Sequence, residues 1–147
     1  MLRIYVDAAT KGNPGESGGG IVYLTDQSRQ QLHVPLGIVS NHEAEFKVLI
    51  EALKQAIANE DNQQTVLLHS DSKIVVQTIE KNYAKNEKYQ PYLAEYQQLE
   101  KNFPLLLIKW LPESQNKAAD MLARQALQKF YPNKKWHCLL NAFPLLI

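Results

Sequence analysis

Three aspartates stand beside small or apolar residues, where a surface charge is not expected. Asp7 follows one apolar run, Asp71 follows a second, and Asp120 lies within an alanine-rich stretch. Because the carboxyl ends of neighbouring parallel strands share one edge of a sheet, Asp7 and Asp71 are expected to meet there. Each aspartate alone fits a helix cap or a surface charge, but the three together favour a shared site.

A fourth carboxylate comes from the helix predicted to begin at Asn41, and the apolar spacing allows either Glu43 or Glu45 to face the same edge. Carboxylates about 4 Å apart repel by roughly 4 kcal/mol per pair, so such a cluster holds either protons or a divalent cation. Oxygen ligands without a cysteine or paired histidines nearby favour Mg²⁺ or Mn²⁺ over zinc. Two such ions can activate a water and stabilise the leaving oxygen of a phosphodiester.

Glycine is concentrated in one part of the chain, because five of the six glycines fall between Gly12 and Gly20. This spacing indicates a hairpin turn followed by a strand. No Gly-Lys-Ser/Thr follows, and a strand rather than a helix comes next, which excludes a phosphate loop and a dinucleotide-binding turn. Besides a turn, the glycines indicate a place where another backbone can approach closely.

Apolar periodicity predicts the elements that must position these residues. Alternating apolar positions predict three strands joined by turns, an unbroken apolar run predicts a buried fourth strand, and helical spacing predicts amphipathic helices around them. The predicted strands are 2–6, 20–25, 32–39, 65–69 and 105–111, and the predicted helices are 41–59, 73–82, 91–99 and 118–130. This order predicts an α/β fold, in which an antiparallel meander and a parallel βαβ unit form one mixed sheet flanked by helices.

The composition is that of one compact domain, which we expect to span residues 1–130 of the 147. A formal charge of +1 provides no global basic field, so a nucleic acid would have to be held locally. The lone Cys138 excludes an internal disulfide and fits a reducing compartment. The apolar stretch before Asp7 is too short for a signal peptide, and no apolar run approaches the roughly 20 residues that span a bilayer. A soluble cytoplasmic protein without a membrane partner is expected.

Residues 131–147 form an apolar C-terminal extension that ends in Phe143-Pro144-Leu145-Leu146-Ile147. So many apolar side chains at a chain end require cover. We expect them to pack on the same domain or on a partner, including a second copy of the chain.

The unusual residues fall into four motifs in a set order, namely Asp7 to Gly15 with its Gly-Asn-Pro-Gly turn, Ser40 to Glu45, His69 to Ser72, and Asn116 to Ala123. In this order they resemble the motifs of the type 1 ribonuclease H family, over about residues 1–130. The resemblance implies the ribonuclease H-like fold, with a five-stranded mixed sheet. It also selects Glu45 over Glu43 as the fourth carboxylate.

By resemblance, Asp7, Glu45, Asp71 and Asp120 bind two Mg²⁺ or Mn²⁺ ions, and the reaction is hydrolysis of the RNA strand of an RNA–DNA hybrid to a 5′-phosphate and a 3′-hydroxyl. The hybrid is expected to lie on the glycine turn, on two helix starts and on a reduced basic segment. Contacts in the minor groove would meet the 2′-hydroxyls that distinguish RNA from DNA, and Ser40 would help to hold a phosphate of the DNA strand. The residues expected to contact the hybrid are Asn13, Gly15, Ser40, Asn41, His42, Ser72, Lys81, Lys85 and Lys88. For the three lysines, a solvated helix end is the alternative.

The chain departs from the family pattern in the loop before the last helix, where many bacterial members carry an assisting histidine. Here Glu113 is the only ionisable residue of the loop before Lys117, and Trp110-Leu111-Pro112 resembles a branch without that histidine. His42 replaces the second asparagine of its motif. The alternatives are therefore a module of this fold that binds hybrid or structured RNA with little or no cleavage, and a DNA-cutting relative such as an integrase or junction resolvase. The latter class shares the carboxylates but lacks the glycine turn.

Overall fold

A five-stranded sheet carries the fold in the computed structural model, which describes residues 1–132. Its strands lie in the order β3-β2-β1-β4-β5. The antiparallel strands β1, β2 and β3 are followed by β4 and β5, which run parallel to β1. The bounds are Leu2–Gly12, Gly15–Leu24, Arg29–Val39, Thr65–Ser70 and Leu105–Trp110 for β1 to β5. The predicted mixed sheet is confirmed, whereas the predicted packing or dimerisation of the C-terminal extension falls on 133–147, outside the described residues.

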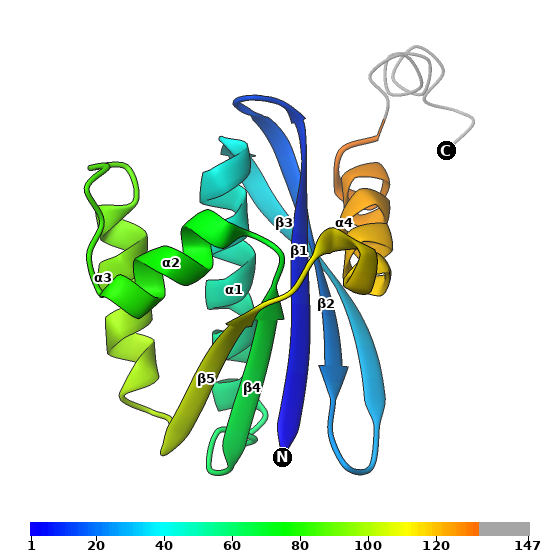
Figure 1. Ribbon diagram of the computed structural model, residues 1–147. Coiled ribbons are helices and arrows are strands. Elements are labelled where there is room, and N and C mark those ends of the chain that lie inside the picture. The colour runs from blue at the N-terminus through cyan, green and yellow to red at the C-terminus, as the bar shows by residue number, and fades with distance from the viewer. Residues whose placement is uncertain (133–147) are drawn as a thin grey trace.

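Helices cover both faces of this sheet, with α4 on the side opposite α1 (Figure 1). The bounds are Asn41–Ala58 for α1, Lys73–Lys81 for α2, Gln90–Glu100 for α3 and Lys117–Phe130 for α4, with a short 3₁₀ turn, η1, at Glu113–Gln115. The predicted order of strands and helices is therefore confirmed. None of the described helices is long and apolar enough to cross a membrane.

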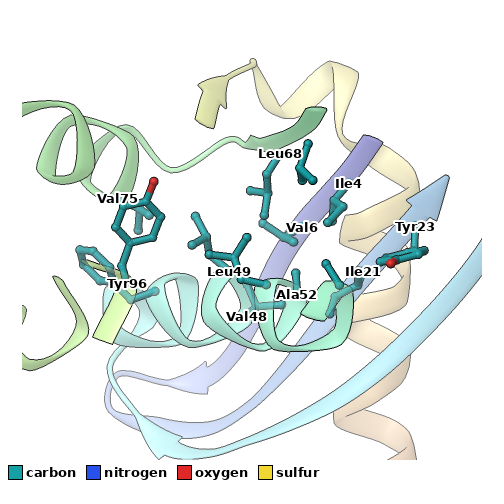
Figure 2. Close-up of a cluster of buried hydrophobic side chains, with 14 of the residues drawn as sticks. Ile4, Val6, Ile21, Tyr23, Val48, Leu49, Ala52, Leu68, Val75 and Tyr96 are labelled. Carbon is teal, nitrogen blue, oxygen red and sulfur yellow. The ribbon is translucent and has the colours of Figure 1, made fainter. Parts of the chain in front are cut away.

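The main hydrophobic core lies between α1 and the sheet (Figure 2). Ile4 and Leu68 come from neighbouring parallel strands, and Val48, Leu49 and Ala52 come from the buried side of α1. All five are at most 1% exposed. Burying a large aliphatic side chain stabilises the folded state by about 1.5–3 kcal/mol, so this layer fixes α1 against the strands that carry the carboxylates.

The first hairpin is longer than the sequence predicted. Strand β1 continues past Val6 to Gly12, because its antiparallel pairing with β2 extends to the Gly12–Gly15 pair. Asp7 therefore lies within β1, and the expectation that it ends the strand is wrong. The parallel pairing with β4 does stop at Val6 and Ser70, so Asp7 is the first residue of β1 beyond the end of β4. This offset still leaves Asp7 at the carboxyl edge of the parallel strands.

Three consecutive glycines of β2 allow both helical layers to approach closely. A Cβ at Gly18 or Gly20 would collide with α4, whereas a Cβ at Gly19 would meet Val48 of α1. At Gly20 it would lie 2.5 Å from the Ala123 nitrogen and would overlap the carbonyl oxygen of Ala119. The sequence predicted that another backbone approaches the glycine-rich strand closely, and in the structure this is the backbone of α4.

Replacing Gly20 with Ala should push α4 away from β2 and lower the free energy of unfolding by about 3 kcal/mol, the upper range for overpacking. The matched control is Gly19→Ala, whose Cβ would meet the Val48 side chain at 2.7 Å rather than backbone. Urea unfolding of both variants without metal measures the difference. Equal losses in the two variants would show that the approach of α4 is not limited by backbone contact.

Candidate active site

Three carboxylates from three different elements converge at the carboxyl edge of β4. Asp7 belongs to β1, Glu45 to the second turn of α1, and Asp71 follows directly after β4. One oxygen from each lies within 4.8 Å of the others. Asp7 is only 6% exposed and is therefore largely withdrawn from water, whereas Glu45 and Asp71 are partly buried. The predicted meeting of Asp7 with Asp71 is observed.

The structure gives different roles to Glu43 and Glu45, between which the apolar spacing of the sequence could not decide. Glu43 closes the start of α1, because its backbone N–H donates to Ser40 Oγ and its carboxylate accepts from the Ser40 hydroxyl at 2.9 Å. The Tyr92 hydroxyl also donates to Glu43 at 2.9 Å. Burial alone would raise the pKa of Glu43, but these hydrogen bonds outweigh burial and hold it below its usual value. Glu43 is thus a capping residue, and Glu45 is the carboxylate at the site.

Burial and mutual repulsion raise the pKa values of the clustered acids. Burial, followed by the charges of Asp71 and Asp120, raises the pKa of Asp7 to about 8. Burial and the charge of Asp7 raise the pKa of Glu45 well above its usual value, and burial also raises the pKa of Asp71. Without a cation, the site therefore retains protons at neutral pH.

Asn116 fixes the position of Asp71. Its Nδ2 donates to the Val6 carbonyl at 2.8 Å and to Asp71 Oδ2 at 3.2 Å, and the residue is 2% exposed. The backbone of Asp71 is held from the other side, where Trp110 Nε1 donates to its carbonyl at 3.1 Å. Strand β1, the end of β5 and the start of α4 therefore meet at this aspartate.

Asp120, in the first turn of α4, lies beside the cluster but outside the set of three converging oxygens. It forms an ion pair with Arg124, with Nη2 3.1 Å from Oδ2. Both residues line a pocket of about 180 Å³ together with Asp7, Glu45 and Asp71, and Glu113 contributes a fifth carboxylate to its wall. The structure thus brings all four predicted metal ligands to one pocket.

The donor set suits a hard divalent cation. The three converging groups offer only carboxylate oxygens, which Mg²⁺ and Mn²⁺ prefer. Glu45 Oε2 is buried and has no hydrogen-bond partner among the described residues. A buried carboxylate oxygen without a donor is costly, and a bound cation would compensate it.

Several residues predicted to bind nucleic acid surround a second pocket. Asn41, His42 and Ser72 line a pocket of about 350 Å³ that shares Glu45 and Asp71 with the first one. Ser40 and Ser72 are the N-caps of α1 and α2. Two helix N-termini therefore open near the carboxylates, and this arrangement can accept phosphate groups.

The remaining predicted contacts lie farther from the carboxylates. Asn13 Oδ1 accepts from the Asn41 N–H at 3.1 Å, which ties the glycine turn to α1, and Gly15 directly after this turn begins β2. Lys81 ends α2, and Lys85 and Lys88 are exposed in the segment before α3. Neither of the two pockets around the carboxylates is lined by Asn13, Gly15 or any of these three lysines.

Two residues of the site had no role in the sequence analysis. Asn116 stood inside a quoted motif, but its hydrogen bonds to β1 and Asp71 depend on tertiary structure. Arg124 follows Asp120 by four residues, a spacing that places an acid and a base side by side on a helix. That spacing is visible in the sequence and was the available signal.

Comparison with known proteins agrees with the fold. The family described as reverse transcriptase-like matches residues 5–126. The chain is 98% identical over 135 residues to the Enterococcus faecalis protein named "Putative hydrolase EbsB", covering 92% of this chain and all of that relative. It is 34% identical over 84 residues to a ribonuclease H of Trichodesmium erythraeum, covering 57% of this chain and about half, 51%, of that relative.

Among solved structures, that of LC11-RNase H1 in complex with an RNA/DNA hybrid superimposes with a TM-score of 0.80 at 25% identity. The match covers 88% of this chain and 98% of that one. The sheet order, the converging carboxylates and the family match over most of the described residues lead to one conclusion. The chain belongs to the reverse transcriptase-like family, within the ribonuclease H proteins.

Proposed function

We propose that this chain is a metal-dependent endonuclease that hydrolyses the RNA strand of RNA–DNA hybrids, leaving a 5′-phosphate and a 3′-hydroxyl, and that residues 1–130 form its catalytic domain. The observation that carries the proposal is the convergence of Asp7, Glu45 and Asp71 within 4.8 Å, although they repel one another. The similarity to a ribonuclease H solved with an RNA/DNA hybrid supports this choice of substrate.

Asp7, Glu45, Asp71 and Asp120 would hold two Mg²⁺ or Mn²⁺ ions in the pocket that they line. Bound divalent ions supply the charge that activates a water and stabilises the leaving oxygen of the phosphodiester. The protein itself contributes orientation, because Asn116 keeps Asp71 directed toward Asp7 through a hydrogen bond of 3.2 Å. No side-chain nucleophile is required for this reaction.

The hybrid would approach along the second pocket, where α1 and α2 begin. Ser40 and Ser72 cap these helices, and the positive end of each helix dipole favours phosphate oxygens. Asn41 and His42 line the same pocket and offer polar groups to the minor groove, where 2′-hydroxyls mark an RNA strand.

A hybrid-binding module with weak cleavage is the second candidate function. One observation favours it: Glu113, in the loop that lacks the family histidine, adds to the negative charge that raises the pKa values of Glu45 and Asp71. A basic group at this place would instead attract the phosphodiester. The two candidates differ in turnover rather than in binding.

Incubation of the chain with labelled hybrid, RNA duplex and DNA duplex, in Mg²⁺ and in Mn²⁺, should yield cleavage of the hybrid RNA strand alone. Asp71→Asn should reduce the rate by at least about 100-fold, because it removes charge from the ion site, while the amide can still accept the Asn116 hydrogen bond. Asp26→Asn, on the exposed β2–β3 turn, is the control. Hybrid binding without cleavage would support the binding module, and cleavage of DNA duplex would contradict both candidates.

Without metal, the chain should lose stability as the pH rises from about 4 to about 8. Folded Asp7 keeps its proton up to a pKa of about 8, whereas in the unfolded chain this aspartate has its ordinary pKa of 3.8, so the free energy of unfolding declines across that window. Asp7→Asn should therefore raise the thermal midpoint by roughly 5 °C at pH 8 and by less at pH 5. Thermal unfolding in a chelator measures this, and a pH-independent difference would show that Asp7 titrates normally.

Replacing Lys81, Lys85 and Lys88 together with Ala should weaken hybrid binding and reduce its salt dependence, since each phosphate contact releases counterions with a logarithmic slope of about 0.9. Binding is measured in Ca²⁺ by anisotropy of a labelled hybrid between low and moderate salt. A control variant removes two positive charges elsewhere, by replacing Lys101 and Lys129 with Ala at the far ends of α3 and α4. An unchanged slope in the triple variant would identify this segment as a solvated helix end.

A further inference from the structure

Arg124 is bound to the one predicted metal ligand that stands apart from the converging three. Its Nε lies 3.2 Å from Asp120 Oδ1 and its Nη2 lies 3.1 Å from Asp120 Oδ2. One guanidinium therefore engages both carboxylate oxygens, in the fork geometry that makes such pairs directional. Any divalent cation that needs an oxygen of Asp120 meets a competing positive charge.

The same arginine lines the carboxylate pocket. Arg124, Asp120, Asp7, Glu45 and Asp71 all contribute to the wall of the space of about 180 Å³. Asp120 is also close enough to Asp7 for its charge to act on that carboxyl group. Asp120 thus interacts both with the buried acid Asp7 and with the Arg124 guanidinium.

We propose that Arg124 is a positioning residue that holds Asp120 in the absence of metal and competes with a divalent cation that would use Asp120 as a ligand, thereby setting the affinity of that ion. This inference rests on the proposed function in assigning Asp120 as an ion ligand. It goes beyond the four carboxylates, because it assigns a role to the positively charged side chain of Arg124.

The exposure of the pair makes such an exchange feasible. The Arg124 side chain is 75% exposed and that of Asp120 is 36% exposed, so water and salt screen their attraction. Surface ion pairs of this kind contribute little to stability, and a divalent ion attracts the carboxylate more strongly than a single positive charge does. Arginine remains charged at every accessible pH, so the positive charge that Arg124 places beside Asp120 does not change with pH.

A plain helix-surface ion pair is the competing explanation, since Asp120 and Arg124 are four residues apart on α4. That explanation predicts a small loss of stability on removing Arg124 and no change in cation binding. The proposal predicts a change in cation binding that passes through Asp120. The two explanations therefore differ in a quantity that can be measured without substrate.

The test is a titration of the full chain with Mn²⁺, with free ion detected by electron paramagnetic resonance. Arg124→Gln should bind Mn²⁺ about tenfold more tightly than wild type, because one positive charge is removed beside a divalent ion. Arg124→Lys, which retains the charge, should bind like wild type. Lys129→Gln is the matched control, because it removes one positive charge from the last turn of the same helix.

A second set of variants carries Asp120→Asn. In this background, Arg124→Gln should no longer change the Mn²⁺ affinity, since the coupling passes through the missing carboxylate. Unchanged or weaker Mn²⁺ binding in Arg124→Gln, an equal effect of Lys129→Gln, or persistence of the effect without Asp120 would each overturn the proposal. Because the titration contains no nucleic acid, tighter Mn²⁺ binding in a chain that does not cleave hybrid would refute the proposed function alone. Hybrid cleavage with unaltered Mn²⁺ binding would refute only the role of Arg124.

Discussion

Repulsion among Asp7, Glu45 and Asp71 is the constraint around which this structure is built. These carboxylates share a space in which their oxygens lie within 4.8 Å, and Asp7 is 6% exposed. No single element could hold them there, because Asp7 comes from within β1, Glu45 from α1 and Asp71 from the residue after β4. The packing of α1 on the sheet opposes the repulsion, and a cation would remove it. The stability of the core therefore supports an arrangement that is unfavourable by itself.

Asn116 and the β2 glycines link the carboxylate site to α4, which packs on the face of the sheet opposite α1. Asn116 joins the Val6 carbonyl of β1 to the Asp71 carboxylate from the start of α4. Helix α4 packs closely on β2 because Gly18 and Gly20 leave room for its backbone. The position of Asp120 is consequently set by β2, a strand that contributes no carboxylate to the site. Packing across the sheet and the geometry of the pocket depend on the same contacts.

The sequence predicts the elements well, because burial imposes periodicity, and the order of strands and helices is confirmed. Boundaries are harder: Asp7 looked like a strand end, because apolar alternation stops there, yet pairing with β2 continues to Gly12. Periodicity could not separate Glu43 from Glu45, although Ser40 three residues before Glu43 is a capping signal. The contacts of Asn116 bring together residues more than forty positions apart, and no local pattern contains them.

Local structure also organises the surface assigned to the substrate. Ser40 and Ser72 use their hydroxyls as caps, and Asn13 uses its side chain to hold the Asn41 N–H. Each of these hydrogen bonds satisfies one backbone N–H of a turn or helix start. Groups already fixed by the fold lose little conformational entropy when a ligand binds. The residues that begin α1 and α2 are therefore preorganised, and the polar surface beside the carboxylates follows from the way these two helices start.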